Sequence, residues 1–115
     1  MGPGASHTAP HPDHFRAIYE ALPDPAGITR VADGMYIEVN PAFCQLVGQE
    51  REQILGRTST DLHIWATEQE RSKLVTLLKR DGKVQNLPLN AQSKGQVIPG
   101  QMSAQPVRIG DEDCL

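Results

Sequence analysis

Cys44, His63 and Asp61 come closest to a catalytic constellation, because a thiol, an imidazole and a carboxylate can together form a nucleophilic triad. Such a triad requires the three groups to converge in space, and only Asp61 and His63 are close along the chain. The sequence contains no Gly-rich phosphate loop, no His-Glu-x-x-His pair and no Gly-x-Ser-x-Gly turn. We therefore expect no enzymatic activity in this chain.

Metal binding is a second chemistry that the residue types allow. Three histidines near the N-terminus are spaced as if on one face of a helix, and they are His7, His11 and His14. Pro10 and Pro12 oppose that helix, because proline disrupts helical geometry. We expect residues 1–12 to form a flexible tail with no specific metal site.

The two cysteines, Cys44 and Cys114, form neither a metal-binding pair nor a disulfide framework. Cys44 lies beside apolar positions of a predicted helix, and no basic residue is adjacent in sequence to lower the pKa of its thiol. We expect this cysteine to behave as a small hydrophobic residue.

Length and charge limit the possible classes of function. A chain of 115 residues has room for one domain with a real core, which we expect over residues 13–115. The formal net charge is −3 and no Lys/Arg cluster stands out, which argues against binding to nucleic acid or to an anionic membrane. No apolar run is long enough to span a membrane, and the N-terminus lacks the pattern of a signal peptide. These features favour a cytoplasmic protein.

The segment from Ala32 to Gly48 contains the clearest structural signals. Asp33-Gly34 predicts a tight turn, and the alternation of apolar and polar residues after it predicts a short strand. Asn40 is a suitable helix N-cap, Pro41 suits the first helical position, and Gly48 can end the helix in a left-handed conformation.

Further elements can be placed on both sides of this segment. Residues 26–32 are predicted to form the strand before the turn, and a second short helix is predicted over residues 50–55. Before them, a helix ending at Pro23 carries apolar residues at helical spacing. We interpret these residues as a packing or dimer face, and they are Phe15, Ile18, Tyr19 and Leu22.

The second half of the chain is predicted to contain one long helix and then strands. Thr67 and Glu70 have the spacing of a capping box at the start of this helix, and Asp81-Gly82 ends it. Two strands are predicted between Lys83 and Ile109, joined near residues 93–95. Prolines in these strands predict edge positions or bulges, and they are Pro88, Pro99 and Pro106. This order of elements indicates an α+β domain with helices covering one face of an antiparallel sheet.

In this order and spacing the chain resembles the PAS sensory-domain family from Phe15 onward. The residues that carry the resemblance are Pro23-Asp24, Asp33-Gly34, Asn40-Pro41-Ala42-Phe43, Gly48, Ile54-Leu55-Gly56-Arg57, the Leu62 to Trp65 segment, Asp81-Gly82 and Lys94-Gly95. The resemblance implies a five-stranded antiparallel sheet whose fifth strand lies in its centre. That strand would begin near Asp113, so we expect a longer protein cut inside or just before it.

The resemblance also implies a function. A PAS domain would sense a small ligand, or relay dimer contacts, and pass the change to an output domain after it, such as a helix-turn-helix regulator, a histidine kinase of a two-component system or a cyclic-dinucleotide enzyme. The alternative is a ligand-free PAS module that serves only in dimerisation. A cavity would lie between the sheet and the helices, and its expected lining residues are Ile28, Phe43, Leu55, Trp65, Leu74, Leu78, Met102 and Ala104.

No cofactor is expected. The flavin-binding Asn-Cys-Arg-Phe motif of the family is absent, and the long helix lacks the histidine that its haem-binding branch uses. Two residues keep alternative interpretations. Trp65 is either a core residue or a wall of the cavity, and Arg57 is either a surface residue or a clamp for an acidic ligand.

A homodimer is the expected oligomeric state. If the central strand is cut at Leu115, the neighbouring strands at residues 26–32 and 96–109 are left with unpaired backbone groups, which can pair with another chain. The apolar face of the first helix provides a second route to the same dimer.

Overall fold

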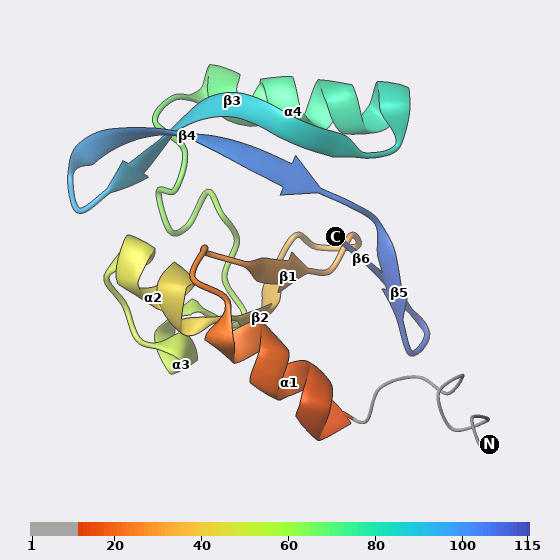
Figure 1. Ribbon diagram of the computed structural model, residues 1–115. Coiled ribbons are helices and arrows are strands. Elements are labelled where there is room, and N and C mark those ends of the chain that lie inside the picture. Colours follow the sequence, from red (N-terminus) through yellow and green to blue (C-terminus); the bar gives the residue numbers. More distant parts are fainter. Residues whose placement is uncertain (1–11) are drawn as a thin grey trace.

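The computed structural model describes residues 12–115, and it confirms the expected α+β fold with antiparallel strand pairs (Figure 1). A flexible tail was predicted over residues 1–12, of which residues 1–11, with two of the three histidines, lie outside the described residues, while Pro12 begins the first helix. The elements in chain order are α1 (Pro12–Ala21), β1 (Gly27–Thr29), β2 (Tyr36–Val39), α2 (Pro41–Val47), α3 (Arg51–Ile54), α4 (Glu68–Asp81), β3 (Val84–Ser93), β4 (Gln96–Ala104), β5 (Val107–Ile109) and β6 (Glu112–Cys114).

The turn, strand and helix predicted between residues 32 and 48 are present. Gly34 adopts a φ of +74°, which the turn between β1 and β2 requires and which glycine accepts without steric cost. The side chain of Asn40 accepts a hydrogen bond from the backbone N–H of Phe43 at the start of α2. Gly48 ends α2 in a left-handed conformation. These local signals therefore decide the structure of the segment.

The strands form three antiparallel pairs, β1 with β2, β3 with β4, and β5 with β6. Beyond these pairs, the end of the chain lies alongside β1. The N–H of Thr29 donates to the carbonyl of Leu115 at 2.9 Å, and the N–H of Leu115 donates to the carbonyl of Thr29 at 2.8 Å. The expectation that the strand at residues 26–32 has an open edge was therefore wrong, because residues 113–115 pair with it.

The hairpin of β3 and β4 accommodates its prolines at no cost in hydrogen bonds between the two strands. In β3, the N–H of Asn90 donates to the Glu70 carboxylate and that of Gln92 to the carbonyl of Ile64, so both point away from β4. Pro99 lies opposite Asn90, and in an antiparallel pair the backbone groups of such opposite residues point away together. The backbone nitrogen of Pro99 therefore faces the outer edge of β4, where no strand needs an N–H from it. This is the edge position that the proline predicted.

The main core lies where β2, α2, α3 and the segment before α4 meet. Its buried members are Val39, Phe43, Ile54, Leu62 and Ile64. The rings of Tyr36 and Phe43 pack at a centroid distance of 4.9 Å, which adds an aromatic contact to this core. Beside the hairpin of β3 and β4, α4 lies along β3 (Figure 1). Leu74 of α4 and Leu89 of β3 are buried.

The predicted capping box of α4 is only half formed. Thr67 accepts a hydrogen bond from the Glu70 N–H through its hydroxyl, at 3.4 Å. The Glu70 carboxylate, however, does not bond back to Thr67. It accepts a hydrogen bond from the N–H of Asn90 at 3.0 Å instead, because β3 passes alongside the first turn of α4. The side chain that was expected to close a local cap thus joins two elements.

Candidate functional site

The residues expected to line a cavity occupy several separate places. Phe43 belongs to the main core, and Leu55 packs against that core. Leu74 is buried on α4, away from this cluster. The other five are half-buried on the remaining elements, and they are Ile28, Trp65, Leu78, Met102 and Ala104.

Trp65 has its polar atom paired within the chain. Its indole Nε1 donates a hydrogen bond to the Ser59 hydroxyl at 2.8 Å. The backbone of Trp65 forms a bridge with Ala91 of β3, and its side chain is half-buried. The indole N–H therefore has a partner within the chain. Arg57 is an exposed residue that donates to the Gln49 side chain at 3.2 Å.

The residues predicted to form the dimer face do not all point to solvent. Tyr19 is buried, and its hydroxyl donates to the carbonyl of Ala26 at 2.8 Å. Ile18 is 65% exposed and Leu22 is 42% exposed. The side chain of Phe15 lies outside the described ones. Tyr19 thus anchors α1 to the rest of the domain, while Ile18 on α1 and Leu22 just after it remain exposed.

Asn40 connects α1, the segment after it and α2. Its side chain is fully buried, and its Oδ1 accepts from the N–H groups of Phe43 and Ala26. Its Nδ2 donates to the carbonyl of Asp24 at 2.9 Å and to that of Tyr19 at 3.5 Å. The residue predicted only as a helix cap therefore also holds the N-terminal region against the core.

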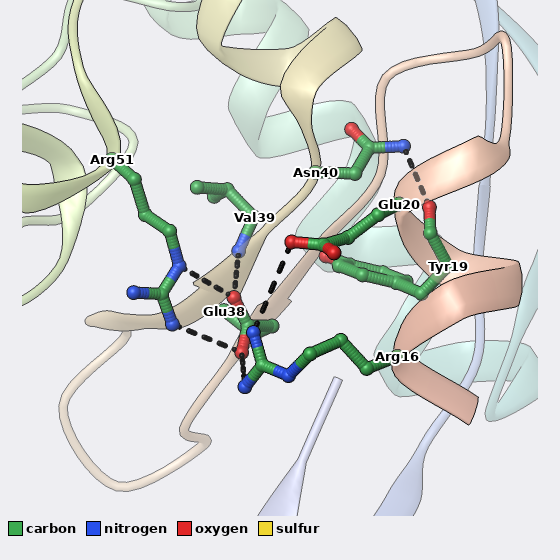
Figure 2. A network of polar contacts seen from close by, with 7 residues as sticks. All are labelled: Arg16, Tyr19, Glu20, Glu38, Val39, Asn40 and Arg51. Atoms are coloured by element: carbon green, nitrogen blue, oxygen red, sulfur yellow. Dashed lines mark hydrogen bonds and ion pairs between the residues drawn. The ribbon is translucent and has the colours of Figure 1, made fainter. Parts of the chain in front are cut away.

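Glu38 on β2 forms a second polar connection to α1 (Figure 2). Its carboxylate accepts two hydrogen bonds from Arg51 of α3, at 2.9 and 3.1 Å, and one from Arg16 of α1 at 3.5 Å. Arg16 also pairs with Glu20 of the same helix at 3.9 Å. Burial raises the pKa of Glu38, but the hydrogen bond and charge of Arg51 outweigh it and hold the pKa below its usual range. Glu38 is therefore ionised at neutral pH.

An open hollow of about 540 Å³ lies beside this network. It contains none of the eight residues expected to line a cavity, and its lining residues are Glu20, Val39, Pro41, Cys44, Gln45, Gly48, Gln49, Glu50, Arg51 and Gln53. Burial and the charge of Glu50 raise the pKa of the Cys44 thiol. The thiol therefore stays protonated at neutral pH, which agrees with the inert role predicted for it.

Of the groups first considered for catalysis, Asp61 makes a local contact and His63 lies exposed on a loop. Asp61 accepts a hydrogen bond from the Thr58 N–H at 3.1 Å, and this contact lowers the pKa of the Asp61 carboxyl. His63 is exposed on a loop with a φ of +54°. Among the side chains that the structure describes, those of residues 16–115, no group of three or more His, Cys, Asp or Glu could hold a metal ion. Nor does this part of the chain contain a helix long and apolar enough to cross a membrane.

Sequence reasoning missed Arg16, Glu38 and Arg51. Glu38 was visible only as a polar position in an alternating strand. Its partners are 13 and 22 residues away in sequence, so no local spacing pattern connects them. Asn40 carried a partial signal, because its role as a cap followed from its place before Pro41.

Comparison with known proteins identifies the family. The family model described as PAS domain matches residues 23–115. The sequence has no significant match among curated proteins. The fold is similar to that of a PAS domain from a two-component sensor histidine kinase, with a TM-score of 0.68 at 13% identity over 89% of this chain and 87% of that one.

Two further solved structures have the same fold. A PAS domain of an HTR-like protein from Haloarcula marismortui has a TM-score of 0.68 at 22% identity, with 89% of this chain and 84% of that one covered. The E. coli DhaR(N)–DhaL complex contains a chain with a TM-score of 0.64 at 15% identity, with 89% of this chain but only 33% of that one covered. The match of the family model over most of the sequence shows that this chain belongs to the PAS domain family.

Proposed function

We propose that this chain is a sensory PAS domain that binds a small ligand and passes the resulting change in conformation to an output domain of the same protein. Membership of the PAS family over residues 23–115 is the observation that carries the proposal. The similar fold in a sensor histidine kinase and in DhaR(N), which is in complex with DhaL, supports signalling through a partner or an attached domain. The domain acts in the cytoplasm through conformation, not catalysis.

The proposed ligand site lies between the inner face of the sheet and the helices. Half-buried side chains still have surface that a ligand could cover. On β4 and α4 they include Met102, Ala104 and Leu78. A ligand changes the balance between two conformations only by binding one of them more tightly. The relevant contact is therefore one that changes when β4 or α4 shifts.

Mass spectrometry tests the ligand directly. We expect the freshly purified protein to have a higher mass under native conditions than under denaturing conditions, with the difference equal to the mass of a retained small molecule. Substituting Met102 by Gln should lower the fraction of loaded protein, whereas the exposed Val97 on the same strand gives a control substitution, Val97→Gln. Identical masses under both conditions, in protein produced in several expression hosts, would contradict the proposal.

A ligand-free dimerisation module is the second candidate, and two exposed apolar side chains near the end of α1 and just after it favour it. Ile18 and Leu22 lie one turn apart, with exposures of 65% and 42%. A second copy of the chain could cover both side chains in an isologous contact. In this case the protein would be a dimer with no difference between its native and denatured protomer masses.

A further inference from the structure

Glu38 lies between two arginines that belong to different helices (Figure 2). Arg51 of α3 donates from Nε to Oε1 at 2.9 Å and from Nη2 to Oε2 at 3.1 Å. Arg16 of α1 donates from Nη2 to Oε2 alone, at 3.5 Å. Arg51 therefore makes the shorter, two-point contact, and Arg16 makes a longer contact to an oxygen that is already in use.

Two guanidinium groups that share one carboxylate weaken each other's hold on it. Arg51 offsets most of the charge that Arg16 would otherwise meet, and the two cations also repel each other. Glu38 is partly shielded from solvent, with 21% of its side chain exposed, whereas Arg16 is 55% exposed. The attraction between Arg16 and Glu38 is therefore weaker with Arg51 present than it would be without it.

The position of Arg16 makes this attraction important for α1. Near its C-terminal end, α1 is fixed to the core by the bond from the Tyr19 hydroxyl to Ala26 and by the bond from Asn40 to the Tyr19 carbonyl. Arg16 lies one turn earlier on the same helix. Its contact with Glu38 reaches the core from a part of the helix that those two bonds leave unfixed.

We propose that the competition of Arg51 and Arg16 for the Glu38 carboxylate sets how tightly α1 is held against the core. A shift of α3 that withdraws Arg51 leaves Glu38 to Arg16 and tightens α1. Loss of the Glu38 charge leaves Arg16 paired only with Glu20 of its own helix, so α1 loses its ion pair with the core and loosens. Arg51 also lines the hollow beside α2 and α3, so a change there reaches α1 through this carboxylate. The inference requires no ligand and stands independently of the proposed sensory function.

Hydrogen exchange of the α1 amides in the whole chain tests the proposal, because it measures local opening of the helix. We expect Glu38→Gln to speed this exchange and Arg51→Gln to slow it. Each effect should be about two- to fivefold, the range that the free energies of exposed ion pairs allow. Arg80→Gln is the matched control, since Arg80 makes a similar ion pair with Asp81 at 2.9 Å at the end of α4.

The double variant with Arg16→Gln separates this role from a general loss of stability. Because Arg51 acts on α1 through the contact between Glu38 and Arg16, Arg51→Gln should no longer slow the exchange once Arg16 is replaced. In the unmodified protein, 1 M salt should speed the exchange of α1, since salt screens the exposed Arg16. Faster or unchanged exchange in Arg51→Gln would overturn the proposal, as would a slowing that persists without Arg16.

Discussion

The side chain of Asn40 is fully buried, and each of its polar atoms has a hydrogen-bond partner. Its oxygen accepts from two N–H groups, and its nitrogen donates to the carbonyls of Asp24 and Tyr19. A buried amide is tolerated only when it is hydrogen-bonded, and this one replaces water for four backbone groups. A single side chain thus caps α2 and holds the chain segment that connects α1 to β1.

Replacing Asn40 by Ala should lower the free energy of unfolding by about 2–4 kcal/mol, because several buried backbone groups lose their partner. Denaturation by urea measures this change. Asn90→Ala serves as a control, since Asn90 is exposed and uses its backbone in its described contacts, and it should change the free energy by less than about 0.5 kcal/mol. A loss below about 1 kcal/mol for Asn40→Ala would show that water takes over these bonds.

The two tyrosines should make the fold sensitive to alkali. Burial raises the pKa of Tyr36 to about 12, and burial also raises the pKa of Tyr19 well above its usual value. In the unfolded chain both phenols ionise near pH 10, so the unfolded state loses protons first as the pH rises. Stability is therefore present below about pH 10 and falls as the pH rises toward 12.

Tyrosinate absorbance in the ultraviolet follows this titration. We expect little ionisation of the native protein at pH 10.5, where the urea-unfolded chain is more than half ionised by its ordinary pKa of about 10. Native and unfolded titration curves that coincide would contradict the burial of both phenols.

At the scale of the elements, local signals were sufficient for caps and turns and insufficient for contacts between elements. The Asn40 cap, the Gly48 stop and the Gly34 turn were predicted because each depends on groups within a few residues. The Glu70 carboxylate shows the limit of such reasoning. Sequence spacing placed it in a capping box, but β3 offers the N–H of Asn90 at 3.0 Å, 20 residues further along the chain.

Glu70→Ala should therefore loosen the junction of α4 and β3, not only the start of the helix. We expect faster amide exchange at Asn90 and a loss of roughly 1 kcal/mol in the free energy of unfolding. Glu68→Ala, in the same helical turn, is the matched control because Glu68 is exposed and takes no part in this bond. Equal exchange at Asn90 in both variants would show that the Glu70 contact does not hold β3.

At the scale of the whole molecule, the family and fold class could be predicted from the sequence, because the order of turns, caps and helices along the chain matches that of the PAS family. The arrangement of ionic contacts could not. Glu38, Arg16 and Arg51 come from three elements, and only the packing of α1 and α3 around β2 brings them together (Figure 2). By contrast, the resemblance placed a central strand near Asp113, and residues 113–115 do pair with β1 on one side while β6 pairs with β5 on the other.

Self-association is a prediction for the whole molecule. The exposed Ile18 on α1 and Leu22 just after it should pack against a second copy, so we expect a dimer at micromolar concentration. Ile18→Glu with Leu22→Glu should give a monomer in sedimentation experiments, whereas Val31→Glu, at an apolar side chain that is 60% exposed in the turn between β1 and β2, should not. A monomer without any substitution, or a dimer that persists in the double variant, would exclude this face as the interface.

The central claim is that the domain works as a sensor through a bound small molecule, and the melting temperature before and after ligand removal tests it most directly. The purified protein is unfolded in urea, freed of small molecules by dialysis and refolded. A ligand that binds only the native state raises its stability according to its concentration and affinity. We predict that the refolded protein melts at a lower temperature and that adding back the released small-molecule fraction restores the original value. Equal melting temperatures of the purified and refolded protein, both unchanged by that fraction, would contradict the claim.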